Sequence, residues 1–382
     1  MNHPLTRSLL FSAAMLTVLS ASSRSFAAPD ERPKDKVFVG YLFGPAREIN
    51  FRLYTHLCHA FLVADGDGNV QPRRNVPSRQ LTGDAHRAGV KVILSLGGWG
   101  WDRQFASIVA RPEAEDRYVK SVMSIVDDSD YDGIDLDWEY PDTEKEIVGF
   151  ERLTRRFRKQ LDAVGDKKKR RMVLTMAASS NPGTLKWLSK EFLLETMDWV
   201  NVMTYDFTGD WTNYAGHHSP LFASSKQPGG TARSTESTMK YLLEERGLPA
   251  DRLAVGIPLY GRGFAVKEPY ASTKDAPKGR VPRGGNYSNI QRLQHEQGWV
   301  RQWDDETKNP WLFSPDRSVV IGYDDAESVA IKTDWAMKQG LRGVFFWQVA
   351  ADRLPDGTNP LQEASRKKWD ESGKPPEAPP GP

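Results

Sequence analysis

The chain has 382 residues, 39% hydrophobic and 10% aromatic, enough for one large core or two smaller ones. With 52 basic and 50 acidic side chains its formal net charge is only +2, so nothing in the charge indicates a nucleic acid or an acidic membrane as partner. The one basic run, residues 167–171, is expected to be a solvated loop. The single cysteine, Cys58, excludes an internal disulfide and is predicted to be a buried small hydrophobe.

Residues 1–27 have the pattern of a secretory signal peptide. Arg7 precedes an apolar stretch from Leu9 to Leu19, and a small-x-small cleavage site ends at Ala27. The stretch is short for a membrane span, and no later segment reaches about 18 uninterrupted apolar residues. We therefore expect an exported protein, periplasmic or extracellular, without a membrane partner. Removing the segment takes away Arg7 and Arg24 and brings the net charge from +2 to 0.

Apolar, β-branched or aromatic runs then alternate with helical patterns. Three segments, 111–128, 146–164 and 234–247, have the periodicity of amphipathic helices. Apolar strands separated by helices indicate a parallel sheet covered on both faces. Eight units in about 330 residues favour an α/β fold, the (β/α)8 TIM barrel. The predicted strands are residues 36–43, 55–63, 91–98, 132–139, 171–178, 198–206, 252–261 and 342–349.

The domain organisation follows from where this alternation is interrupted. The barrel is expected over residues 36–366. After the seventh strand, residues 264–320 lack a long helical pattern and are rich in glycine, proline and aromatic residues, which predicts a small α+β insertion domain. Residues 324–340 are predicted to be the seventh helix, and residues 367–382 a Pro-rich tail.

The segment DGIDLDWEYP, residues 132–141, alternates acidic and apolar side chains within a predicted strand. Residues two apart share a face of a strand, so Asp135, Asp137 and Glu139 are expected to form a row that points into the barrel. Ionised carboxylates so close together repel, so some must share a proton and have raised pKa values. Glu139 falls at the carboxyl end of the strand, where barrel enzymes keep their active sites. Asp132 has the opposite parity, which favours a structural role.

Two other interpretations of the acidic row are weaker. The acids could be structural partners of buried arginine or lysine, but the other predicted strands carry basic residues only at their edges. They could bind a hard metal such as Mg²⁺ or Ca²⁺, but the other strand ends supply tyrosine, tryptophan, methionine and serine rather than further oxygen anions. We therefore expect no metal and no cofactor.

Five ordered motifs resemble those of family 18 glycoside hydrolases, the chitinase family. YDGIDLDWEYP resembles the DxxDxDxE signature, with Asp132, Asp135, Asp137 and Glu139 as its four acids. The other four segments are SLGGW at 95–99, NVMTYDF at 201–207, GIPLYGRGF at 256–264 and GVFFW at 343–347. The similarity runs from about Lys36 to Asp352, and the predicted insertion domain resembles the one that deepens the substrate groove of one chitinase subfamily.

The resemblance implies a hydrolase of chitin or chitooligosaccharides that acts through the substrate's own 2-acetamido group. Glu139 would be the proton donor, Asp137 would hold the acetamido N–H, and Asp135 would share a proton with Asp137. Tyr205 would donate to the acetamido oxygen, with Asp206 near the reacting sugar and Trp347 beneath it. Tyr41 and Ser95 would hydrogen bond to the inner aspartate. The substrate-binding residues implied are Tyr41, Phe61, Ser95, Gly98, Trp99, Met203, Trp211, Arg262, Tyr287 and Trp347.

Other functions stay open at this stage. The same chemistry would serve an endo-β-N-acetylglucosaminidase or a peptidoglycan hydrolase, and a chitin-binding lectin is a third class. Such lectins typically lose the acid that Glu139 supplies here. Relatives often carry glutamate where this chain has Gln348. The resemblance also implies non-proline cis peptides at Ala60-Phe61, Glu139-Tyr140 and Trp347-Gln348, and we expect a monomer.

Overall fold

The computed structural model describes residues 35–45, 48–73, 75–229, 233–276 and 285–372. The predicted signal peptide and the end of the predicted tail lie outside these residues, as do positions 277–284 of the predicted insertion domain.

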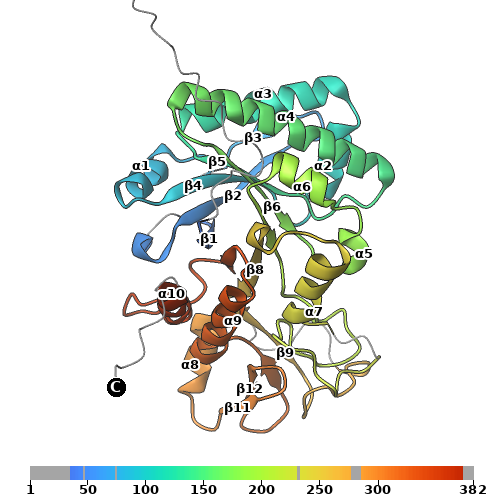
Figure 1. The fold of residues 1–382 in the computed structure, drawn as a ribbon. Helices are drawn as coiled ribbons and strands as arrows, with labels where there is room; N and C mark the ends of the chain where they lie inside the picture. Colours follow the sequence, from blue (N-terminus) through green and yellow to red (C-terminus); the bar gives the residue numbers. More distant parts are fainter. Residues whose placement is uncertain (1–34, 46–47, 74, 230–232, 277–284, 373–382) are drawn as a thin grey trace, which may run out of the picture. The chain divides into compact units, whose positions relative to one another are not determined.

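Eight parallel strands close into a barrel, because β1 pairs with both β2 and β14 (Figure 1). This confirms the predicted (β/α)8 TIM barrel. The barrel strands are β1 (Val37–Phe43), β2 (His56–Ala64), β4 (Lys91–Gly97), β5 (Gly133–Asp137), β6 (Val173–Ala178), β7 (Trp199–Val202), β8 (Leu253–Pro258) and β14 (Gly343–Trp347). A short strand, β3 (Val70–Gln71), pairs antiparallel with the end of β2.

Helices cover the outside of the barrel, and in Figure 1 the two longest, α3 and α4, lie side by side. No helix among the described residues is long and apolar enough to cross a membrane. The helices that belong to the barrel are α1 (Arg79–Arg87), α2 (Asp102–Val109), α3 (Pro112–Asp128), α4 (Glu144–Lys168), α5 (Pro182–Leu185), α6 (Lys190–Thr196), α7 (Thr235–Lys240), α9 (Ala326–Lys338) and α10 (Pro360–Ser372).

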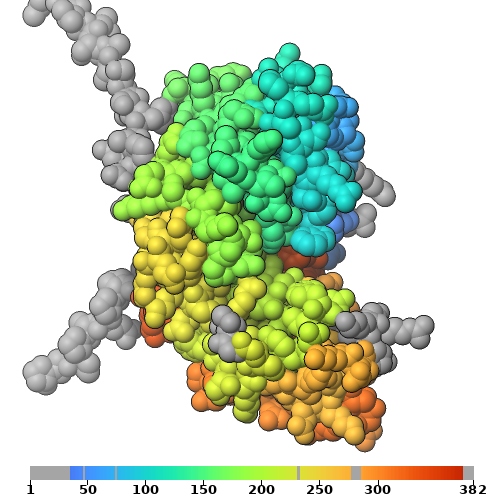
Figure 2. Space-filling model, turned by 90° about the vertical axis from the view of Figure 1, so that its right-hand side faces the viewer, coloured from blue at the N-terminus to red at the C-terminus, as the bar shows by residue number. Residues whose placement is uncertain are grey.

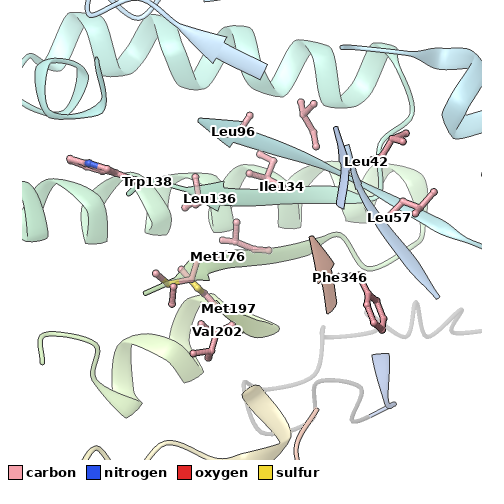
Figure 3. Close-up of a cluster of buried hydrophobic side chains, with 14 of the residues drawn as sticks. Leu42, Leu57, Leu96, Ile134, Leu136, Trp138, Met176, Met197, Val202 and Phe346 are labelled. Atoms are coloured by element: carbon pink, nitrogen blue, oxygen red, sulfur yellow. The ribbon is translucent and has the colours of Figure 1, made fainter. Parts of the chain in front are cut away.

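Strand β5 shows how the alternating sequence builds two separate layers of the core. Ile134, Leu136 and Trp138 point outward into the large apolar cluster between strands and helices (Figure 3). Trp138 stacks on Phe105 of α2 at 5.2 Å between ring centroids and meets Phe150 of α4 edge-on. The acidic residues between them therefore face the barrel interior, as the period of two predicts.

The barrel interior contains a second, smaller core. Tyr41, Cys58, Trp199, Tyr205 and Phe345 belong to it and are buried. Cys58 is fully buried, as expected for a small hydrophobe. Apolar and aromatic side chains thus surround the acidic row of β5 and reduce its contact with water.

A second, antiparallel sheet follows β8 and supports the predicted insertion domain. Its strand order is β10-β9-β13-β12-β11, and it carries helix α8 (Tyr287–Gln294). In Figure 2 the orange atoms, which include residues of this sheet, lie beside the yellow-green segment that follows β7, and Leu221 N donates to Thr307 O between them. The strands are β9 (Tyr260–Phe264), β10 (Gly285–Asn286), β11 (Val300–Asp304), β12 (Asn309–Phe313) and β13 (Val320–Gly322).

Several predicted element bounds differ from the structure. The run 252–261 is two strands, because the chain leaves the barrel after Pro258 and β9 pairs with β13, so the second sheet begins at Tyr260 rather than at residue 264. The predicted helix 234–247 is α7 followed by a π-helical turn at Tyr241–Glu245. Helix α10 continues to Ser372, into the segment predicted as tail.

The basic run at residues 167–171 is not the solvated loop that we expected. Lys167 and Lys168 form the last turn of α4, and Lys168 Nζ lies 2.9 Å from Asp130 Oδ1. Arg170 contacts the same carboxylate at 2.8 Å, and Arg171 pairs with Asp198. The run therefore ties α4 to the amino-terminal end of the barrel strands.

Candidate active site

A cavity of about 320 Å³ opens at the carboxyl ends of the barrel strands. Asp137 ends β5 and Glu139 follows directly, while Trp347 ends β14 on another wall. The predicted site residues that line the cavity are Tyr41, Phe61, Trp99, Asp137, Glu139, Met203, Tyr205, Asp206 and Trp347.

Asp135 lies below the cavity in a cage of hydrogen-bond donors. Its Oδ2 accepts from Tyr41 Oη at 2.9 Å and from Ser95 Oγ at 2.7 Å, the two bonds that the resemblance implied. Its Oδ1 accepts from Thr175 Oγ1 at 2.6 Å and from Asn201 Nδ2 at 3.5 Å. Burial raises the pKa of Asp135, and these donors offset part of that shift. Asp135 is thus buried, but four hydrogen-bond donors of the protein stabilise its carboxylate in place of water.

The carboxyl groups of Asp137 and Glu139 have fewer hydrogen-bond donors around them than that of Asp135. Burial, followed by the charges of Glu139 and Asp135, raises the pKa of Asp137 well above its usual range, and its buried Oδ1 has no hydrogen-bond partner among the described residues. Burial also raises the pKa of Glu139 to about 7, although a hydrogen bond from Tyr140 Oη opposes the shift. Near neutral pH part of the Glu139 population is therefore protonated, the form that a general acid requires.

Asp206 has the opposite environment on the facing wall of the cavity. Its Oδ1 accepts from Tyr260 Oη at 2.7 Å and from Arg262 Nε at 2.8 Å, and His218 Nδ1 lies 3.4 Å away. Burial alone would raise the pKa of Asp206, but His218 and Arg262 hold it well below its usual range. The site thus places a carboxyl group with a lowered pKa opposite one with a raised pKa, a division typical of acid–base chemistry.

Aromatic rings form the other walls. Trp347 stacks with Phe61 at 5.7 Å between centroids and an interplanar angle of 22°. Gly98 also packs against Phe61: it has a φ of +87°, and a Cβ there would lie 2.6 Å from the Phe61 ring. An apolar ring face next to polar groups suits a sugar, whose C–H faces are apolar and whose edges carry hydroxyls.

Five predicted substrate-binding residues lie outside the cavity lining: Gly98, which packs on Phe61, and Ser95, Trp211, Arg262 and Tyr287. Ser95 is fully buried and contacts Asp135. Arg262 is engaged by Asp206, and its guanidinium lies 4.5 Å over the ring of Trp211, which is 55% exposed. Tyr287 is buried in the apolar core at the start of α8, so it does not face the cavity. Helix packing has placed it inward instead.

Asp132 has the structural environment that its parity predicted. Its Oδ2 accepts from Val92 N at 2.8 Å and lies 2.7 Å from His86 Nε2, and Arg170 Nη1 lies 3.5 Å from Oδ1. These contacts lie at the start of β5, away from the cavity. The non-proline cis peptides implied at Ala60-Phe61, Glu139-Tyr140 and Trp347-Gln348 are all present.

Several residues that shape the site were not predicted from the sequence. Thr175 and Asn201 are single polar side chains in otherwise apolar strands, a signal that was available. Tyr260 could also have been predicted, because it lies two residues before Arg262 in the segment GIPLYGRGF. His218 lies in the long connection after β7, and only the tertiary fold brings it to Asp206.

The match to a known family decides what this site belongs to. The family model Glycosyl hydrolases family 18 matches residues 33–352, most of the chain. The chain belongs to glycoside hydrolase family 18. Chitinase A1 of Niallia circulans is 29% identical over 299 residues, which cover 72% of this chain and 42% of that protein. This family 18 chain therefore spans less than half the length of that relative.

Solved structures of family 18 enzymes have the same fold. Ostrinia furnacalis Group IV chitinase, in complex with allosamidin, superposes with a TM-score of 0.79 at 25% identity, over 89% of this chain and 100% of the other. A Cycas revoluta chitinase in complex with (GlcNAc)3 has a TM-score of 0.76 at 28% identity, over 87% and 99%. The family 18 barrel and the surrounding elements are therefore shared over nearly the whole length of both.

Proposed function

We propose that the protein is a chitinase that hydrolyses β-1,4 bonds between N-acetylglucosamine units with retention of configuration. The observation that carries the proposal is the pairing of Glu139 with Asp137: a carboxyl whose pKa lies at about 7 follows, two residues on, a buried carboxylate whose Oδ1 lacks a partner among the described residues. An acid and an unused acceptor on one wall suit a substrate that carries both a glycosidic oxygen and an amide N–H.

The first step breaks the glycosidic bond. Glu139 gives its proton to the leaving glycosidic oxygen as the C1–O bond breaks. The carbonyl oxygen of the substrate's 2-acetamido group forms a bond to the same C1, giving an oxazolinium ion. Asp137 Oδ1 would accept the acetamido N–H and offset the positive charge. Substrate assistance of this kind is a recognised exception to the two-carboxylate scheme of glycosidases.

The second step restores the acid. The Glu139 carboxylate takes a proton from a water molecule, whose oxygen bonds to C1 while the oxazolinium C–O bond breaks. The acetamide is regenerated and the product keeps the β-configuration. Tyr205 would direct its hydroxyl to the acetamido oxygen, and Trp347 would pack beneath the reacting ring. Asp135, which accepts hydrogen bonds from four donors, would share a proton with Asp137.

The known proteins support the substrate class. The Cycas revoluta chitinase binds (GlcNAc)3, and the Ostrinia furnacalis chitinase binds allosamidin. The cavity offers what an N-acetylglucosamine chain needs, with aromatic faces at Trp347 and Phe61 beside acidic groups.

The direct test is the hydrolysis of chitohexaose by the mature protein and by Glu139→Gln. Wild type is expected to release shorter chitooligosaccharides in the presence of EDTA, and the variant is expected to bind the hexamer with a kcat about 10³-fold lower. Binding without cleavage by wild type would favour the lectin. No binding at all would direct the same assay to N-glycans and muropeptides, the substrates of the other two candidate hydrolases.

We also propose that the protein is exported, on the pattern of residues 1–27. The mature protein is then expected to begin just after Ala27 in the periplasm or medium. Cell fractionation followed by amino-terminal sequencing checks this. A cytoplasmic protein that starts at Met1 would contradict it.

A further inference from the structure

Two adjacent histidines, His217 and His218, are both buried and face different carboxylates. His217 Nε2 lies 3.5 Å from Asp304 of β11, and its ring lies 3.8 Å from that of Trp311 in the second sheet. His218 points the other way, toward the cavity wall, where its Nδ1 lies 3.4 Å from Asp206 Oδ1. One sequence pair thus contacts both the insertion sheet and the candidate active site.

The contacts of His218 limit where its ring protons can be. Nε2 lies 3.0 Å from the backbone carbonyl oxygen of Tyr260, and a carbonyl can only accept, so Nε2 carries a hydrogen. Nδ1 is buried and makes no hydrogen bond of standard geometry among the described residues, but the Asp206 carboxylate lies 3.4 Å away, and this contact is attractive if Nδ1 carries a hydrogen and repulsive if it carries a lone pair. The ring of His218 thus lies between Asp206 and the start of β9.

The charges around Asp206 are few and come from three parts of the fold. Arg262 and the hydroxyl of Tyr260 approach from β9, and His218 approaches from the connection after β7. Glu139, after β5, is the acid on which the charge of Asp206 acts across the cavity. Asp206 has a positive φ of 58°, so its backbone conformation depends on the residues that hold its side chain.

We propose that His218 is a positioning residue for the reaction: with a hydrogen on each ring nitrogen, it contacts Tyr260 O and Asp206 and holds the Asp206 carboxylate in place opposite Glu139. The hydrogen bond from Phe207 N to His218 O, at 3.0 Å, closes the loop that joins the two residues. His218 does not line the cavity and acts through Asp206. This inference rests on the proposed function for its kinetic consequence, but the geometry of the ion pair does not depend on it.

Removing His218 should affect one side of the pH profile. Asp206 would lose one of the two cations that lower its pKa, so it would take up a proton at a higher pH. The acidic limb of kcat/KM is expected to move up by about one pH unit, a typical effect of one opposite charge. The alkaline limb, which reports Glu139, is expected to stay in place.

The experiment compares the kcat/KM profiles of wild type, His218→Asn and His217→Asn on chitohexaose. His217 is the matched control, because it is also buried beside a carboxylate but contacts Asp304 instead. Only His218→Asn should move the acidic limb, and Asp206→Asn should show no further movement when His218→Asn is added. An unmoved limb in His218→Asn, or an equal movement in His217→Asn, would overturn the proposal.

A second measurement needs neither hydrolysis nor a variant that folds. Nitrogen NMR of wild type with labelled histidine should show both ring nitrogens of His218 protonated at about pH 7. A bare Nδ1 would overturn the proposal even in an active chitinase. Two protonated nitrogens in a protein that cleaves no chitooligosaccharide would support the ion pair and reject the proposed function, so the two failures are distinct.

Discussion

At the scale of single residues, the proposed mechanism depends most on Glu139. It must be protonated to give a proton to the leaving oxygen, and burial raises its pKa to about 7. Activity is therefore expected on the acidic side and is lost as the pH rises through about 7. The kcat/KM profile of chitohexaose hydrolysis measures this limb. A rate that stays flat from about pH 5 to 9 would contradict the assignment.

The negative charge of Asp206 is expected to raise the pH at which activity is lost, because it raises the pKa of Glu139. After burial, it is the group that raises the pKa of Glu139 further, against the hydrogen bond from Tyr140. Asp206→Asn should lower the pKa of Glu139, so the alkaline limb should move to lower pH. The same profile, fitted for the position of its limb rather than its height, checks this. A limb at unchanged or higher pH would show that the two groups do not interact.

Thr175 tests the donor cage beneath the acids. Its hydroxyl donates to Asp135 at 2.6 Å, and Thr175→Val keeps the shape but removes the donor. We expect kcat to fall about ten- to a hundredfold, because the acidic row loses its fixed geometry. The free energy of unfolding should fall by about 1.5–3 kcal/mol. The control is Thr154→Val, which removes a buried hydroxyl that donates to Phe150 O within α4 and should leave kcat unchanged.

At the scale of elements, α4 packs through Phe150 on Trp138, which follows β5. It begins with a capping box, in which Thr143 Oγ1 accepts from Glu146 N and Glu146 Oε2 accepts from Thr143 N. Thr143→Ala is expected to lower the free energy of unfolding by about 1 kcal/mol, and Thr143→Ser to retain most of it. Urea denaturation measures both. Equal losses in the two variants would show that the hydroxyl cap is not the cause.

The elements also show what the sequence could predict. The barrel strands and the inward acids of β5 follow from local patterns, because strand parity alone decides which way Asp135 and Leu136 point. The split between β8 and β9 does not, since the pairing of β9 with β13 is a long-range contact. Tyr287 lies in the apolar core rather than at the cavity for a similar reason: helix packing, not motif spacing, sets where this aromatic side chain faces.

At the scale of the whole molecule, a buried ion pair between Lys332 of α9 and Asp324, just before this helix, also hydrogen bonds to Ser219 in the segment that follows β7. Lys332 Nζ donates to Asp324 at 2.5 and 2.7 Å and also to the carbonyl of Ser219. Lys332→Ala would leave Asp324 buried and unpaired, which should cost about 3–5 kcal/mol in thermal or urea unfolding.

This ion pair should also make the fold sensitive to acid. Burial raises the pKa of Asp324, but Lys332 lowers it below its usual value overall. Its contribution to stability is therefore full above the unfolded-state pKa, about 3.9, and is lost as the pH falls below that. Lys332→Met should show a weaker acid dependence than wild type, and an identical dependence would contradict this assignment.

Substrate assistance is the central claim, and the anomeric form of the first product tests it most directly. Proton NMR during the first minutes of chitohexaose hydrolysis should show new reducing ends in the β-form, before mutarotation equilibrates them. The fully deacetylated hexamer, which lacks the acetamido carbonyl, should not be cleaved in the same experiment. New reducing ends that appear first in the α-form, or cleavage of the deacetylated chain, would contradict the mechanism.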